Sequence, residues 1–66
     1  MNININGQAR DLPDGATLND AVFQFAKRPE LVITELNGAI IDRARWAETR
    51  LSAGARLELV AFVGGG

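Results

Sequence analysis

Cysteine and histidine are both absent from this chain of 66 residues. Their absence excludes disulfides, thiol nucleophiles, iron–sulfur clusters and zinc sites of the usual kind. The sequence also lacks a glycine-rich phosphate loop with its lysine, and a serine–histidine pair. We therefore do not expect the chain to be an enzyme by itself, or to bind a metal or cofactor of its own.

An excess of charge of one sign and a long hydrophobic run are missing too. The formal net charge is −1, and the seven basic residues form no block, which argues against nucleic acid or an anionic membrane as a partner. No apolar run is long enough to cross a bilayer, and "MNININGQAR" does not resemble a secretory signal. We expect a cytoplasmic protein.

The length predicts one small domain, which buries about 60% of the surface that its unfolded chain exposes. Little room remains for both a core and a deep catalytic cleft. The acidic residues are scattered along the chain, as expected for a solvated surface. They are Asp11, Asp14, Asp20, Glu30, Glu35, Asp42, Glu48 and Glu58.

The first residues read as a β-hairpin. "NININ" alternates apolar and polar residues, which predicts a half-buried strand. Asn6-Gly7 is a strong hairpin signal, because both residues accept the positive φ angles of a tight turn. "QARDL" would return as the partner strand, with Ala9 or Leu12 pointing inward.

The stretch "TLNDAVFQFAK" has helical periodicity. Thr17 is a good N-cap, and Asp20 completes an approximate capping box. Lys27 and Arg28 are expected at the negative end of the helix dipole, before Pro29 stops the helix. The apolar face consists of Leu18, Ala21, Val22, Phe25 and Ala26.

The second half of the chain predicts three more strands and a short helical turn. "LVITELNG" and "AII" form a hairpin around Asn37-Gly38, and "ARLELVAFV" is the final strand. Between them, "DRARWAET" could form a helical turn begun by Asp42, with Trp46 packed at the core edge. The arginines of this segment either solubilise the protein or offer a docking face. They are Arg43, Arg45 and Arg50.

This order of elements predicts an α+β domain in which one main helix crosses a mixed sheet of four to five strands. If the first and last strands lie side by side and parallel, the fold is the β-grasp, or ubiquitin-like, fold. We expect residues 1–63 to form this domain and residues 64–66 to form a flexible glycine tail.

The ending "AFVGGG" is the one compositional break in the sequence. Gly64 and Gly65 have no side chains, so they can thread a narrow channel into the active site of a partner. The carboxylate of Gly66 is ionised at neutral pH, since the pKa of such a group is about 3.3–3.7. It could donate an acyl group only after activation, for instance by adenylation. The alternative is a frayed end without function.

The last strand is apolar on both faces near its end. If Leu57, Leu59 and Ala61 face the helix, Val60 and Phe62 face outward. These two residues would form an apolar patch beside the tail, and such patches mark partner sites. Single exposed apolar residues are also common, and this remains the alternative.

The run "NGAIIDRARWAETRLSAGARLELVAFVGGG" closely resembles the C-terminal half of the ThiS family, the sulfur carriers of thiamine biosynthesis. The shared features include Arg43 with Trp46-Ala47, the turn at Gly54 and the terminal Gly65-Gly66. The Asn-Gly turn and the "TLND" helix start extend the likeness over almost the whole chain.

The resemblance implies a carrier on which other enzymes act. A ThiF-type adenylyltransferase would adenylate Gly66 with ATP and magnesium, which belong to that partner. A sulfur donor enzyme would convert the adenylate to a thiocarboxylate, and thiazole synthase (ThiG) would take the sulfur. Three other functions remain open: the small subunit of molybdopterin synthase, a ubiquitin-like modifier joined to lysines, and a plain interaction module.

Overall fold

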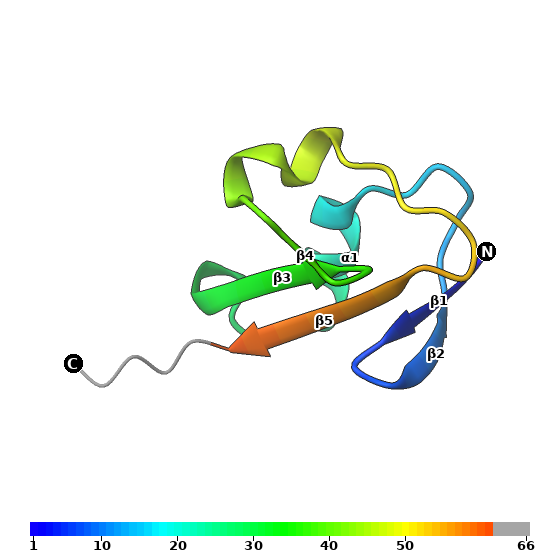
Figure 1. Ribbon diagram of the computed structural model, residues 1–66, viewed down its shortest axis with the longest axis horizontal. Coiled ribbons are helices and arrows are strands. Elements are labelled where there is room, and N and C mark those ends of the chain that lie inside the picture. The colour runs from blue at the N-terminus through cyan, green and yellow to red at the C-terminus, as the bar shows by residue number, and fades with distance from the viewer. Residues whose placement is uncertain (62–66) are drawn as a thin grey trace.

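The computed structural model describes residues 1–61 and shows a five-stranded sheet with one main helix (Figure 1). The strand order is β2-β1-β5-β3-β4. β1 and β5 are parallel, and the other described pairs are antiparallel. The elements are β1 (Asn2–Ile5), β2 (Gln8–Asp11), α1 (Leu18–Phe25), the 3₁₀ helix η1 (Pro29–Leu31), β3 (Val32–Leu36), β4 (Ala39–Ile41), the 3₁₀ helix η2 (Arg43–Glu48) and β5 (Arg56–Ala61).

The parallel pairing of the first and last strands decides the topology. Asn4 pairs with Arg56 and Ile5 pairs with Leu57, so β5 lies in the middle of the sheet between β1 and β3. This arrangement confirms the predicted β-grasp fold. Residues 62 and 63, which the sequence also assigned to the domain, lie outside the described residues, as does the glycine tail.

Both Asn-Gly pairs form the hairpin turns that the sequence predicts. Asn6 and Asn37 have φ angles of 52° and 50°, and the glycine after each is also at positive φ. Asparagine and glycine tolerate this left-handed conformation better than other residues. In the first hairpin Leu12 is the inward residue, because it is buried whereas Ala9 is exposed.

The start of α1 is as predicted, but its end is not. Thr17 accepts a hydrogen bond from the backbone N–H of Asp20, and the Asp20 carboxylate accepts one from the backbone N–H of Thr17. The helix ends at Phe25, because Ala26 already has an extended backbone. Lys27 and Arg28 therefore lie beyond the helix and not in its last turn.

The core lies between the sheet and the layer formed by α1 and η2, which Figure 1 shows on the same side of the sheet. Residues Leu18, Ala21 and Val22 of α1 are fully buried. Phe25 and Ala26 belong to the same predicted face but are only half-buried, since they lie where the helix ends. The helix thus covers one part of the sheet and leaves the rest to shorter segments.

Trp46 joins η2 to the sheet through a buried hydrogen bond. Its indole Nε1 donates to Oγ1 of Thr34 at 3.0 Å, and that hydroxyl donates to the carbonyl of Ile41 at 3.0 Å. Thr34 is completely buried, and Trp46 is nearly so. Trp46 is therefore a core residue, as the sequence suggested.

Substitution of Thr34 by valine should destabilise the protein although it makes the core more apolar. It leaves the buried indole N–H of Trp46 without an acceptor, which costs about 1–3 kcal/mol in the free energy of unfolding. Urea denaturation measures this loss. Thr49→Val is the control, because the Thr49 hydroxyl bond to the Arg45 carbonyl is exposed. A Thr34→Val protein as stable as wild type would contradict this account.

Candidate functional site at the end of strand β5

The end of β5 is held by the first hairpin turn as well as by its neighbouring strands. The side-chain amide of Asn6 makes two bonds to the backbone of Leu59. Nδ2 donates to the Leu59 carbonyl at 3.2 Å, and Oδ1 accepts from the Leu59 N–H at 2.8 Å. The parallel ladder between β1 and β5 ends at the pair of Ile5 and Leu57. The Asn6 side chain bonds to β5 as the backbone of a next residue in β1 would, and so anchors β5 beyond the end of this ladder.

Asn37 fixes the start of β5 in a similar way. Its Oδ1 accepts a bond from the N–H of Arg56 at 2.9 Å, and its backbone N–H donates to the Arg56 carbonyl at 2.8 Å. The two turn asparagines therefore bond to β5 near its two ends. The position from which residues 62–66 follow is set by the sheet.

The outer face of the sheet carries an apolar patch that includes Val60. Val60 is 53% exposed and pairs with Ile33 of β3, which is 42% exposed. Ile40 of the edge strand β4 is also exposed. We call these three residues the outer patch. The outward direction of Val60 is as predicted, whereas Phe62 lies outside the described residues.

Acidic side chains accompany the outer patch. Glu35 of β3 lies directly opposite Glu58 of β5 and also opposite Ile40 of β4. Like charges directly opposite one another on a sheet are unfavourable. The outer patch is therefore apolar and lies beside two negatively charged side chains, Glu35 and Glu58.

The other face of β5 is only partly covered. In the sequence, an outward Val60 goes together with Leu57, Leu59 and Ala61 on the helix side, and these three residues are covered there to different extents. Leu57 is fully buried, but Leu59 is half-buried and Ala61 is exposed. The reason is the early end of α1, which leaves the last residues of β5 without a helix above them.

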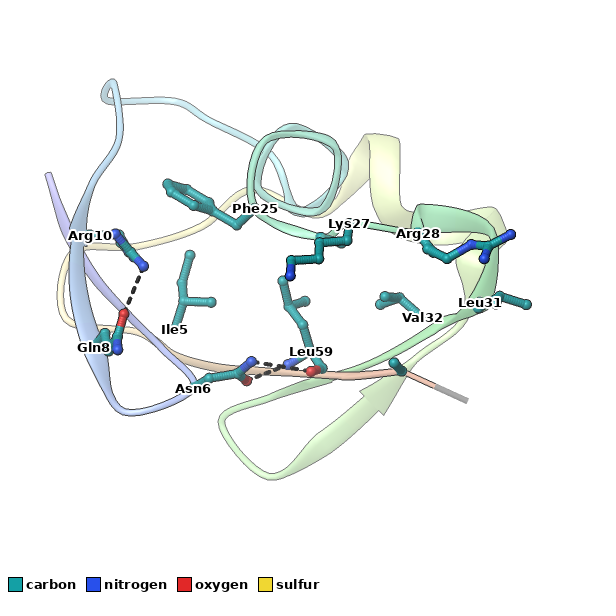
Figure 2. A pocket seen from close by; sticks show the side chains of 12 residues that line it. Ile5, Asn6, Gln8, Arg10, Phe25, Lys27, Arg28, Leu31, Val32 and Leu59 are labelled. Carbon is teal, nitrogen blue, oxygen red and sulfur yellow. Dashed lines mark hydrogen bonds between the residues drawn. The ribbon is translucent and has the colours of Figure 1, made fainter. Parts of the chain in front are cut away.

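Leu59 and Ala61 instead line a groove of about 580 Å³ between α1, the first hairpin and the segment that leads into β3 (Figure 2). We call it the basic groove. Figure 2 shows Arg10 and Arg28 on opposite sides of it and Lys27 between them. The apolar lining is Ile5, Phe25, Leu31, Val32, Leu59 and Ala61 with Ala26, and the polar lining is Asn6, Gln8, Arg10, Lys27 and Arg28.

The charges around the basic groove are partly fixed by neighbours. The guanidinium of Arg10 bonds to Oε1 of Gln8 at 2.7 Å and lies 5.3 Å from the ring centre of Phe25. Arg28 forms an ion pair at 3.3 Å with Glu30, and Glu30 itself does not line the groove. The pKa of Glu30 is lowered, first by a bond from its own backbone N–H and then by Arg28 and Arg43, so this carboxylate stays ionised at neutral pH.

Arg43 has a structural role. Its Nη2 donates to the carbonyls of Pro29 and Glu30, each at 3.0 Å, and its guanidinium lies 4.5 Å from the ring centre of Trp46. It thereby ties η2 to η1. Arg45 forms an exposed ion pair with Glu48 at 3.2 Å, which contributes little to stability.

Gly64, Gly65 and Gly66, which the sequence singles out for the chemistry, lie outside the described residues. Among residues 1–61, no cluster of acidic side chains could hold a metal ion. No helix in the described part of the chain is long and apolar enough to cross a membrane. Within residues 1–61, the outer patch and the basic groove both include residues from the end of β5.

Sequence reasoning missed three parts of this site, which are the apolar neighbours of Val60, the asparagine bonds to β5 and the basic groove. The alternation in "VITEL" could have placed Ile33 on the outer face with Val60. The basic groove left no such signal, because it depends on the residue at which α1 ends and on the distance between segments far apart in the chain.

Comparison with known proteins identifies the family. The ThiS family model matches residues 3–66. The chain belongs to the ThiS family. A crystal structure of the thiamine biosynthesis protein ThiS from Geobacter metallireducens is similar, with 27% identity, a TM-score of 0.81 and full coverage of both chains. The fold shared with that structure is the one described above.

Two curated relatives are thiazole synthases. The one from Magnetococcus marinus is 32% identical and the one from Paramagnetospirillum magneticum is 30% identical, each over all 66 residues of this chain. The ThiS-family chain spans about a fifth of the length of these relatives, since the match covers 20% of each.

Replacement of Asn6 by glycine should loosen the end of β5. Glycine accepts the φ of 52°, so the turn is kept and the loss is that of the two bonds to Leu59. We expect severalfold faster hydrogen exchange of the Leu59 amide and a loss of about 1 kcal/mol in stability. Asn37→Gly is the control, since it should affect the Arg56 amide. Unchanged protection at Leu59 would argue against the anchoring role of Asn6.

Proposed function

We propose that this protein is a sulfur carrier of thiamine biosynthesis and that the carboxylate of Gly66 carries the sulfur. The observation that supports this most is the match of the ThiS family model, which reaches from residue 3 to residue 66 and so includes the terminal glycines. The similar Geobacter structure, named a thiamine biosynthesis protein, is consistent with it.

The proposed chemistry takes place on the backbone and needs no reactive side chain. The Gly66 carboxylate attacks the α-phosphate of ATP and releases pyrophosphate, which gives an acyl-adenylate. A reduced sulfur nucleophile then adds to the acyl carbon, and AMP leaves. The product is a thiocarboxylate in which one sulfur replaces one oxygen. Gly64 and Gly65 would thread the partner's active site without steric conflict.

The catalysts are partner enzymes. A ThiF-type adenylyltransferase uses ATP and magnesium, and a sulfur donor enzyme supplies the nucleophile. Thiazole synthase is the proposed acceptor. The match to one fifth of two proteins named thiazole synthase supports this choice of acceptor, because it associates a segment like this chain with that activity.

Intact-mass spectrometry tests the proposed function. The protein is incubated with ATP, magnesium, a ThiF-type adenylyltransferase and a sulfide source. We expect a mass increase equal to the replacement of one oxygen by one sulfur, located on Gly66 by fragmentation. A variant without Gly65 and Gly66 is the control and should show no change. Absence of the shift in the full chain, or conjugates to lysines in its place, would overturn the proposal.

The outer patch is the proposed docking surface for these enzymes, together with Phe62. Val60→Asp should keep the fold, because the side chain is exposed, and should weaken binding to the partner enzymes by about tenfold through loss of apolar contact. Calorimetric titration measures the affinity. Phe23→Asp is the matched control, since Phe23 is an exposed residue of α1 outside the patch. Equal affinities for wild type and Val60→Asp would exclude Val60 from the interface.

A further inference from the structure

The basic groove lies on the opposite side of β5 from the outer patch. Consecutive residues of a strand point to opposite faces, so Leu59 and Ala61 line the groove whereas Val60 belongs to the outer patch. Both surfaces therefore adjoin the last described residues of the chain. The groove differs from the outer patch in its charge, and this difference indicates its occupant.

The groove combines an apolar floor with cationic sides. Phe25 and Leu59 are half-buried, and Leu31 remains 37% exposed. Partly exposed apolar side chains that line one concavity gain free energy when a partner covers them. An apolar side chain between Phe25 and Leu59 would complete a packing layer that the short helix leaves open (Figure 2).

Three cations line the groove, and no carboxylate among residues 1–61 lines it with them. Arg10 is held in place by Gln8 and by the ring of Phe25, so a ligand would not have to order it. Lys27 forms no ion pair with another described residue. The exposed pair of Arg28 with Glu30 is weak enough to rearrange.

We propose that the basic groove binds an acidic segment of one of the enzymes that act on the tail. The segment places an apolar side chain between Phe25 and Leu59 and carboxylates against Arg10 and Lys27. This inference rests on the proposed function, which supplies the partner enzymes. The net charge of −1 disfavours a nucleic acid, whose binding needs a more extensive basic face.

Charge reversal in the groove tests this proposal. The variant Arg10→Glu/Lys27→Glu is compared with Arg45→Glu/Arg50→Glu, which changes the net charge equally at exposed positions outside the groove. Calorimetric titration measures the affinity of each for the adenylyltransferase and for thiazole synthase, at low and at moderate salt. We expect the groove variant to bind at least one enzyme about tenfold more weakly, with a smaller salt dependence, and the control to bind as wild type does.

The outcomes separate the inference from the proposed function. Equal affinity of the groove variant and the control for both enzymes overturns the inference and leaves the proposed function intact. If the wild-type protein binds neither enzyme and gains no sulfur, both fail together. Amide NMR spectra of the two variants confirm that each is folded.

Two other occupants of the groove would also overturn the inference. A second copy of the chain would appear as concentration-dependent association of the wild-type protein that the groove variant loses in sedimentation experiments. If residues 62–66 of the same chain occupied the groove, deletion of residues 62–66 would change the NMR signals of Phe25 and Leu59.

Discussion

The structure depends on the position of β5 between β1 and β3. A parallel pair on one side and an antiparallel pair on the other place this strand at the centre of the sheet, where it joins the first hairpin to the second. The parallel ladder with β1 is short, and Asn6 extends it by pairing its side-chain amide with Leu59. Asn6 thereby joins the turn of the first hairpin to β5, which is distant in the sequence. The same turn therefore helps to fix the end of β5, after which the tail follows.

Most of the fold could be predicted because its signals are local. Strand alternation, two Asn-Gly turns and the Thr17–Asp20 capping box each act within a few residues, and the structure confirms them. The sequence predicted a longer α1 than the structure has. Pro29 shows where the helix has to have stopped, but the extended backbone at Ala26 does not follow from residue type. That small difference has a large consequence, because it leaves Leu59 and Ala61 uncovered.

The site was less predictable than the fold for the same reason. The outward direction of Val60 follows from alternation alone, whereas its neighbours Ile33 and Ile40 depend on the register between strands. The asparagine bonds to β5 join residues up to 53 positions apart, and an Asn-Gly turn gives no sign of them in the sequence. The sequence left Arg43 open as a solubilising or a docking residue, whereas in the structure its guanidinium binds the carbonyls of Pro29 and Glu30 and stacks on the ring of Trp46.

A carrier that is loaded by one enzyme and unloaded by another has to present the same short tail to two active sites. Residues 62–66 would span at most about 17 Å if extended, so the active site of a docked partner has to lie close to the end of β5, and surfaces that adjoin this end are well placed to hold the partner. Strand alternation provides two such surfaces at almost no cost in chain length: Val60 belongs to an apolar face with acidic neighbours, and Leu59 belongs to a groove with cationic sides. Under the proposed function, an enzyme docked at the outer patch could in addition contact the basic groove, because both surfaces adjoin the same end of β5.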